Sequence, residues 1–388
     1  MKASTVDLVV AASGLSSLIC EHADAAERER RVSPAVIDAL ARAGIFHMFV
    51  PKKFGGLEVD VASGVRAIER LSAADGSTGW CAMIGATTGV ISAYLAEDVA
   101  REIYGEGPGV MTGGVVAPRG TAEAVDGGYR VSGRWPFASG CEHCRWLGGV
   151  CLVRRNGELE RLPGGDPDLR MILFPASEVE IIDTWHVSGL RGTGSQDMAV
   201  NDTLVQPEYT FSFVRDQPRH PGPLYGFSLM GLLAVCVASV ALGIARSALD
   251  EILEIAQTKV PAGRRKPLGE WGVAQLEVAQ AEAALRAGRA FLFEAIDGMW
   301  RTLAKGDAPS ARQRALVRLA ASNAVTGAVR AVDSAYNLGG GSSIYESSLL
   351  QRRFRDIHTL TQHVMVGPSS YEAAGRVLLG QDVPPGFL

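Results

Sequence analysis

Hydrophobic and polar positions follow a helical spacing through the N-terminal part of the chain. Charged and apolar residues recur with this spacing over 25–43, which predicts one continuous helix, and again over 61–73. The next stretch, STGWCAMIGATTGVISAYLA, is apolar and rich in small residues, so we expect a buried helix capped by Ser77 or Thr78. The pattern therefore predicts an N-terminal α-helical domain at 1–108.

Short strand candidates replace the helical pattern after this domain. The segment GGYRVSGRWPFASG sets β-branched and aromatic residues between glycines, and RWLGGVCLV, MILFPA and MAVNDTLV continue the series. Asp126-Gly127-Gly128 is a hairpin signal within it. We expect a central β domain at 109–212, followed by a proline-rich linker at 213–226.

Helical spacing returns at 227–388 and predicts a C-terminal bundle of long helices. Residues 227–245 carry no charge and are just long enough to span a bilayer. They are rich in small residues and run into the amphipathic ARSALDEILEIAQTK, so we expect a helix buried in the bundle and no membrane span. The fold class that follows is α+β, with helices, then a sheet, then helices.

Composition and charge narrow the range of partners and compartments. The 38 basic and 42 acidic residues give a net charge of −4, and no Lys/Arg block suggests nucleic acid as a partner. Six cysteines are few for 388 residues and indicate a reducing compartment. Cys141 and Cys144 form a C-x-x-C without a second half, so we expect packed thiols and no metal. The opening MKASTVDLVVAASG does not resemble a signal peptide, which favours a cytoplasmic protein.

Three clusters of glycine, hydroxyl and aromatic residues carry the candidate chemistry, because the P-loop, G-x-S-x-G, H-E-x-x-H and strand-bound G-x-G-x-x-G motifs are absent. WPFASG at 135–140 is suited to lie against a flat ring, or is a turn with packed aromatics. GLRGTGS at 189–195 is suited to line a phosphate site or the entrance to a substrate site, or is only a tight connection between strands. YNLGGGSS at 336–343 allows backbone amides to approach a pyrophosphate, or is a flexible loop between helices.

Taken together, these clusters resemble the acyl-CoA dehydrogenase superfamily over nearly the whole chain. Within it the sequence is most similar to the two-component, flavin-dependent monooxygenase branch, and WPFASG and RDIHTLTQH are the most specific pieces. The resemblance implies an N-terminal helical domain, a β-barrel-like domain and a C-terminal four-helix bundle. It also implies a homotetramer.

A missing carboxylate separates this branch from true acyl-CoA dehydrogenases, which need a Glu to remove the α-proton of a thioester. Neither of the two family positions of this base is acidic, because IHTLTQHVMV follows RFRD and GFSLMGLLAV precedes the LGIA motif. Glu346 and Glu372 are the only nearby candidates for a displaced base. An acyl-CoA dehydrogenase with a displaced base therefore stays open, as does a non-catalytic flavin-binding protein.

The resemblance implies an oxygenase component that hydroxylates a phenol- or indole-type substrate through a flavin C4a-hydroperoxide. Reduced flavin comes from a separate NAD(P)H-dependent reductase, since no NAD(P)H site is visible. Ser139 corresponds to a residue near flavin N5, and His363 to one that contacts the substrate heteroatom, accepting a proton or holding an NH or oxide oxygen. Trp80, Ser195 and His358 are the further candidates for substrate contact.

The resemblance also assigns the cofactor, FAD by preference with FMN left open. Phe137, Ala138 and Ser139, with Trp135 on the same strand, are expected to hold the isoalloxazine. Contacts to the phosphates or adenine, partly from a neighbouring subunit, are expected from a second set: Arg264, Arg265, Gly339, Gly340 and Gly341. His47 stands where relatives often carry Arg, and its role is left open.

Overall fold

The computed structural model describes residues 7–383. Residues 1–6, part of the opening stretch on which the expected lack of a signal peptide depends, lie outside this range. The N-terminal helices are α1 (Leu8–Gly14), α2 (Ser16–Glu29), α3 (Pro34–Arg42), α4 (Val61–Ala74), α5 (Gly76–Thr88) and α6 (Glu97–Tyr104).

Two local expectations for these helices were wrong. The single helix expected over 25–43 is divided, because Arg30 adopts the left-handed conformation (φ 55°) and ends α2, while Ser33 and Pro34 begin α3. Helix α5 is capped neither by Ser77 nor by Thr78. Asp75 is the cap, and its carboxylate accepts a 2.7 Å hydrogen bond from the Thr78 amide.

The central part of the chain forms one mixed sheet in the order β6-β7-β2-β1-β3-β5-β8, with β4 paired to β3. Strands β1 and β3 are parallel, and the other neighbours are antiparallel. The expected hairpin is confirmed, because Asp126 and Gly127 join β1 to β2 with Val125 paired to Gly128. The strands are β1 (Thr112–Val125), β2 (Gly128–Ala138), β3 (Trp146–Arg155), β4 (Glu158–Leu159), β5 (Leu169–Pro175), β6 (Glu180–Ile182), β7 (Gln196–Val205) and β8 (Thr210–Phe211).

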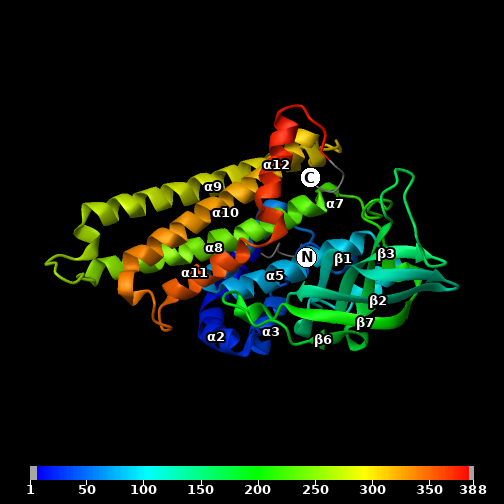
Figure 1. Ribbon diagram of the computed structural model, residues 1–388, viewed down its shortest axis with the longest axis horizontal. Helices are drawn as coiled ribbons and strands as arrows, with labels where there is room; N and C mark the ends of the chain where they lie inside the picture. Colours follow the sequence, from blue (N-terminus) through cyan, green and yellow to red (C-terminus); the bar gives the residue numbers. More distant parts are fainter. Residues whose placement is uncertain (1–6, 384–388) are drawn as a thin grey trace, which may run out of the picture.

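The C-terminal helices extend away from the sheet as an elongated bundle (Figure 1). Helix α8 is the one helix of residues 7–383 that is long and apolar enough to cross a membrane, and 78% of its most apolar window is buried inside the protein. This agrees with the expected buried helix. The helices are α7 (Pro223–Gly226), α8 (Leu229–Thr258), α9 (Gly272–Ala304), α10 (Ala311–Gly339), α11 (Leu349–Leu360) and α12 (Pro368–Leu378).

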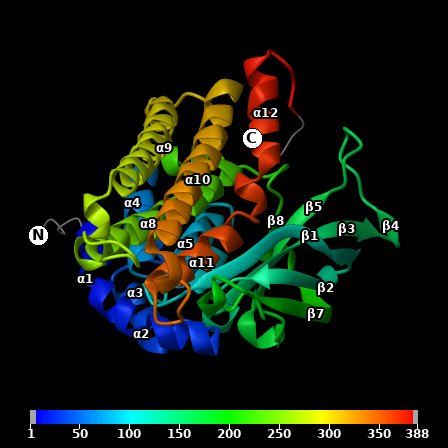
Figure 2. The same ribbon diagram turned by 60° about the vertical axis from the view of Figure 1, so that its left-hand side comes forward.

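Helices α4 and α5 join the bundle to the sheet. Both pack against α8, and α5 also packs against β1. Close approach requires glycine here, since a Cβ on Gly243 of α8 would lie 2.4 Å from the Glu69 carbonyl oxygen of α4. Figure 2 shows α5 between the bundle helices and the strands. The expected order of helices, sheet and helices is confirmed, and α5 brings residues of the first part to the end of β2.

Candidate active site

A chain of hydrogen-bonded side chains joins α5 to the sheet at the end of β2. Trp80 on α5 donates its indole N–H to Ser139 Oγ at 2.9 Å. Ser139 Oγ lies 2.7 Å from Ser195 Oγ, which in turn lies 2.7 Å from Thr193 Oγ1. All four side chains are buried. Three of these residues, Trp80, Ser139 and Ser195, were candidates from the sequence, and the structure brings them together.

The protons in this chain can be assigned, because each hydroxyl has one proton to donate. Thr193 donates to the Leu190 carbonyl at 2.8 Å, so it must accept from Ser195. Ser195 must then accept from Ser139. Ser139 therefore donates its hydroxyl hydrogen bond to Ser195 and accepts a hydrogen bond from Trp80. One lone pair on Ser139 Oγ is left for a further N–H donor.

Residues of α11 hold the GLRGTGS loop, which carries Thr193 and Ser195, in place. Leu190 adopts a left-handed conformation (φ 49°), and its amide donates to Asp356 Oδ1 at 2.6 Å. Gly189 leaves no space for a side chain, since a Cβ there would lie 2.1 Å from the Arg355 carbonyl oxygen. The loop returns to the sheet where the Gly140 amide donates to the Thr193 carbonyl at 2.8 Å.

Asp356 anchors this loop through the Leu190 amide, a role that the sequence did not reveal. It is the acid of RRFRD, which carried the resemblance without any role for this side chain. Burial and the neighbouring Asp75 raise the pKa of its carboxyl from 3.8 to about 7. The available signal was an acid that follows three arginines, Arg352, Arg353 and Arg355, on an amphipathic helix.

His363 lies beside this hydrogen-bonded chain, just after α11 and at the start of a short 3-10 turn, Val364–Val366. Its ring packs edge-on against Trp80, with the centroids 5.3 Å apart. Its Nδ1 accepts a 3.3 Å hydrogen bond from the Met365 amide, so the proton of the neutral ring is on Nε2. Burial, with a smaller contribution from Arg318, lowers the pKa of His363 to about 4. The neutral ring thus presents an N–H donor, whereas one of the roles expected from the sequence was to accept a proton.

The other histidine candidate lies in a different environment. His358 Nε2 is 2.8 Å from Asp333 Oδ1, and its ring contacts Phe354 with the centroids 4.5 Å apart. The structure gives it no contact with Trp80, Ser139 or His363. It therefore joins α11 to α10 and does not belong to the cluster.

The end of β2 suits a flat ring, as a flavin requires. The β2–β7 ladder contains an irregularity between Trp135 and Ala138, which turns Phe137 outward with a left-handed φ of 66°. The Phe137 side chain is 67% exposed and packs edge-on against Trp185. The Trp135 indole is instead fully buried inside the sheet region and donates to the Val150 carbonyl at 2.9 Å. An exposed aromatic, small neighbours and the acceptor on Ser139 fit one edge of an isoalloxazine.

The second set of cofactor candidates lies at the far end of the bundle, where α9 begins and α10 ends (Figure 1). Arg264 packs over the Trp271 ring, 4.4 Å from its centroid, and Arg265 is exposed. Gly339 is the last residue of α10, and its carbonyl accepts from Lys259. Gly340 and Gly341 follow it and have open space around them. One protomer therefore does not bring these residues to the end of β2.

Both candidates for a displaced base are exposed. Glu346 lies in the loop before α11, and Glu372 lies on α12. Neither forms a described contact with Ser139 or His363. The part of the chain that the structure describes also contains no group of three His, Cys, Asp or Glu side chains suited to a metal.

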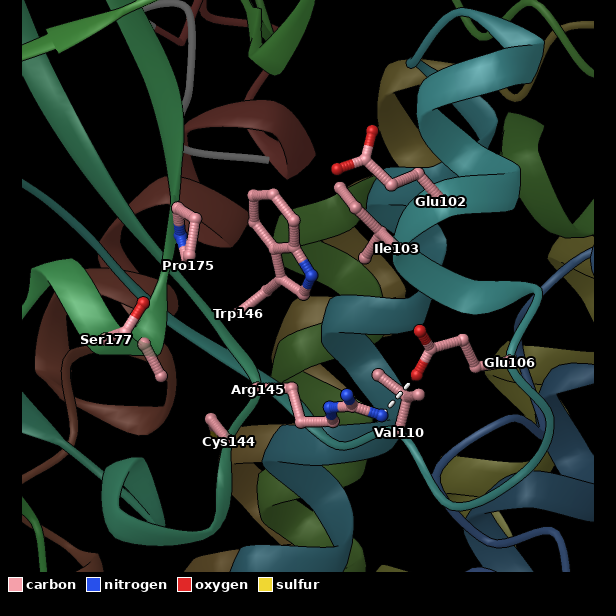
Figure 3. Close-up of a pocket in the computed structure, with 10 residues that line it drawn as sticks. Glu102, Ile103, Glu106, Val110, Cys144, Arg145, Trp146, Pro175 and Ser177 are labelled. Atoms are coloured by element: carbon pink, nitrogen blue, oxygen red, sulfur yellow. Dashed lines mark hydrogen bonds and ion pairs between the residues drawn. The ribbon is translucent and has the colours of Figure 1, made fainter.

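A separate hollow of about 400 Å³ lies between α6, the start of β3 and the end of β5 (Figure 3). His47 is buried next to this hollow, where its Nε2 lies 3.1 Å from the Val110 carbonyl, and burial lowers its pKa. None of the other site candidates lines it. Its walls are Glu102, Ile103, Glu106, Val110, Cys144, Arg145, Trp146, Pro175, Ala176 and Ser177.

Comparison with known proteins agrees with this fold. The family model described as "Acyl-CoA dehydrogenase, N-terminal domain" matches residues 15–103, and "Acyl-CoA dehydrogenase, C-terminal domain" matches 235–368. An indole-3-acetate monooxygenase from Pseudomonas putida is 37% identical over 93% of this chain and 91% of its own length. The oxygenase component of an FADH(2)-dependent resorcinol hydroxylase from Rhizobium sp. is 32% identical over 97% and 94%.

A solved structure gives the same result. The HsaA monooxygenase from M. tuberculosis superposes with a TM-score of 0.91 and 26% identity, covering 100% of both chains. The fold and these relatives define a flavin-dependent oxidoreductase. The chain belongs to the acyl-CoA dehydrogenase family, and within it to the branch of reduced-flavin-dependent monooxygenases.

Proposed function

We propose that this protein is the oxygenase component of a two-component monooxygenase that hydroxylates an aromatic substrate of the indole or phenol type. A separate NAD(P)H-dependent reductase supplies the reduced flavin, FAD by preference and FMN as the alternative. Bound reduced flavin activates O₂ and supplies the oxygen atom. The relatives named above act on indole-3-acetate and on resorcinol, which supports an aromatic substrate. We place the reaction in the cytoplasm.

The observation that carries this proposal is the free lone pair on Ser139. The Ser139 hydroxyl donates to Ser195 and accepts from Trp80, so a ligand atom that bonds to it must be a hydrogen-bond donor. The reduced isoalloxazine carries an N–H at N5, whereas the oxidised ring has an acceptor there. We assign Ser139 the role of accepting from this N–H, which selects the reduced ring and fixes its orientation.

His363 and Trp80 are assigned to the substrate. The two rings meet edge-on, and His363 presents Nε2–H because Met365 occupies Nδ1. A donor at this place holds a substrate oxygen or stabilises negative charge that develops on it. The Trp80 indole gives an aromatic wall for a flat substrate. Both rings also exclude water from the reacting atoms.

An acyl-CoA dehydrogenase with a displaced base receives no support from the arrangement. Such an enzyme needs a carboxylate next to the flavin, but Glu346 and Glu372 are exposed and do not contact the cluster. A non-catalytic flavin-binding protein accounts less well for an acceptor on Ser139 and an N–H donor on His363 that both adjoin Trp80.

The first test supplies chemically or enzymatically reduced FAD or FMN with O₂ and a panel of indoles and phenols. We expect hydroxylated product in near-stoichiometric yield with one of them, and little hydrogen peroxide. In parallel, oxidised flavoprotein is mixed with acyl-CoA esters without oxygen. Bleaching of the flavin there, with no aromatic product in the first assay, would establish a dehydrogenase. If neither assay shows a reaction, the non-catalytic flavin-binding protein is the remaining interpretation.

We also propose a homotetramer in which a neighbour completes the flavin site. Arg264 lies between α8 and α9 and Gly339–Gly341 at the end of α10, at the bundle end that Figure 1 shows far from strand β2. Exposed apolar side chains gather there, including Val273 and Leu276 at the start of α9. A groove of about 670 Å³ between α9 and α10 adjoins them. Light scattering should give four times the 41.1 kDa chain mass. A monomer with full flavin affinity contradicts this.

A further inference from the structure

Arg318 is a buried cation without an anionic partner. It lies on α10, its residue is only 5% exposed, and its guanidinium is surrounded by neutral acceptors. Nη1 donates to the Met230 carbonyl at 3.3 Å and to Met365 Sδ at 3.1 Å, and Nη2 donates to Ser370 Oγ at 2.9 Å. Its Nε is buried and has no hydrogen-bond partner. Within residues 7–383 no Asp or Glu forms an ion pair with it.

The other deeply placed arginines of the bundle differ in this respect. Arg352 forms ion pairs with Asp24 and Glu27, and the buried Arg353 has Asp75 Oδ1 4.0 Å from its Nη1. A buried charge without a counter-charge is costly, and arginine cannot avoid the cost by losing its proton. The exception at Arg318 therefore indicates a place where an anion is supplied from outside the chain.

The position of Arg318 ties that anion to the proposed substrate site. Met365 lies between Arg318 and the neutral His363 ring, since its amide donates to His363 Nδ1 while its sulfur accepts from Arg318. Ser370, the third contact, lies in the first turn of α12, the helix that follows His363 in the chain. The low pKa of His363 is caused in part by the charge of Arg318, which agrees with this proximity. Only Met365 therefore separates His363 from the Arg318 guanidinium, so a ring bound between Trp80 and His363 lies close to this cation.

We infer that Arg318 is a specificity-determining residue that binds the carboxylate of an aromatic acid, a flat ring with a short carboxylate-bearing side chain. The inference rests on the proposed function, because the ring is the one to be oxygenated. Arg318 touches no reacting atom in this assignment. It selects the acid over neutral rings of the same shape through charge-assisted hydrogen bonds, which the orphaned Nε and the nearby Nη atoms can donate.

The test compares two ligands that differ only in this group, indole-3-acetate and the neutral 3-methylindole. Calorimetric titration into the purified protein without flavin should give tighter binding of the acid by roughly 10- to 100-fold, the range of a charged hydrogen bond. Arg318→Met should remove this preference and leave the affinity for 3-methylindole within about 3-fold. Arg318→Lys should keep part of it. The acid's KM should rise in Arg318→Met far more than its kcat falls.

Arg312→Met is the matched control, because Arg312 is exposed on the first turn of the same helix. It should leave both affinities unchanged. Equal affinity of the wild-type protein for the two ligands overturns the inference even if Arg318→Met does not fold. The inference is also overturned if Arg318→Met loses affinity for both ligands equally, or if it loses affinity for reduced flavin but keeps its affinity for the acid. If neutral rings are oxygenated without any preference for acids, only this inference fails. The proposed function fails if no ring is oxygenated.

Discussion

Trp80 Nε1 donates a 2.9 Å hydrogen bond to Ser139 Oγ, although the two residues belong to an N-terminal helix and to the end of a strand in the sheet. The contact sets the position of the hydroxyl and one of its two acceptor sites. Because Ser195 takes the hydroxyl proton, the side chain can only accept from a ligand. A buried serine in this environment is suited to the N–H of a reduced flavin.

Replacement of Ser139 by Ala should therefore uncouple the reaction without unfolding the protein. The variant keeps the small volume at the end of β2 but loses the acceptor for N5–H. We expect weaker binding of reduced flavin by roughly 3- to 10-fold, the usual effect of one hydrogen bond. Hydrogen peroxide released per reduced flavin should increase, as measured by a peroxidase-coupled assay against product. Ser132→Ala, at an exposed position of the same strand, is the control. Unchanged coupling in Ser139→Ala would remove the assigned role.

Replacement of His363 by Ala should slow oxygen transfer by about 10- to 100-fold while flavin binding stays intact, because a donor to developing charge is lost. His363→Gln keeps an N–H donor and should recover part of the rate. His358→Ala serves as the control, since His358 bonds to Asp333 away from the cluster. Single-turnover traces with excess reduced flavin separate the transfer step from binding. Wild-type transfer in His363→Ala would exclude the residue.

The pH dependence gives an independent check on His363. Its pKa is lowered to about 4, so the neutral ring is present above that pH and is lost only as the pH falls through it. The rate of oxygen transfer should then show no inflection near the ordinary histidine pKa of about 6.5. An inflection there that disappears in His363→Gln would mean that the ring titrates during catalysis and acts as a base.

Periodicity predicted the order of the elements, and the family resemblance indicated which residues form the cluster. Neither predicted the contacts between them. The strand ending in Ser139, the glycine loop with Ser195 and the segment after RRFRD were all visible as local patterns. That Trp80 lies against both Ser139 and His363 depends on α5 crossing between bundle and sheet. No local pattern specifies such a crossing.

The failures have local physical causes. Arg30 ends α2 in a left-handed conformation that a helical hydrophobic pattern does not reveal, and Asp75 takes the cap expected from Ser77 or Thr78. Asp356 and Arg318 were missed because charged residues on helices are normally solvated. Only the three-dimensional packing shows that one is an anchor and that the other lacks a counter-charge.

Replacement of Gly189 by Ala tests whether the loop position matters to the site. The new Cβ would lie 2.1 Å from the Arg355 carbonyl oxygen and 2.7 Å from Thr359 Oγ1, so the loop must move away from α11. We expect a loss of about 1–3 kcal/mol in the free energy of unfolding, typical of overpacking, and increased peroxide release as Ser195 shifts. Gly164→Ala, where a Cβ meets nothing within 4 Å, should change neither quantity. Destabilisation without any change in coupling would mean that the loop supports only the fold.

Asp356 gives a prediction about stability and pH. Burial and Asp75 raise the pKa of its carboxyl from 3.8 to about 7, so the folded state binds a proton that the unfolded state has released over this interval. Because the folded state binds more protons there, this group makes the free energy of unfolding decrease as the pH rises from about 4 to about 7. Above that pH its contribution is constant.

Asp356→Asn removes this titration and keeps an oxygen that accepts from the Leu190 amide. The difference in unfolding free energy between wild type and variant, measured by urea titration at several pH values, should therefore change in favour of the variant between pH 4 and 7 and then level off. Asp356→Ala removes the proton site and the acceptor together. It should share the flat pH profile but be less stable at every pH and less well coupled, because Leu190 and the loop are released. A difference between wild type and Asp356→Asn that does not vary with pH would show that the buried carboxyl keeps an ordinary pKa, and the loop would then be held by a charged anchor.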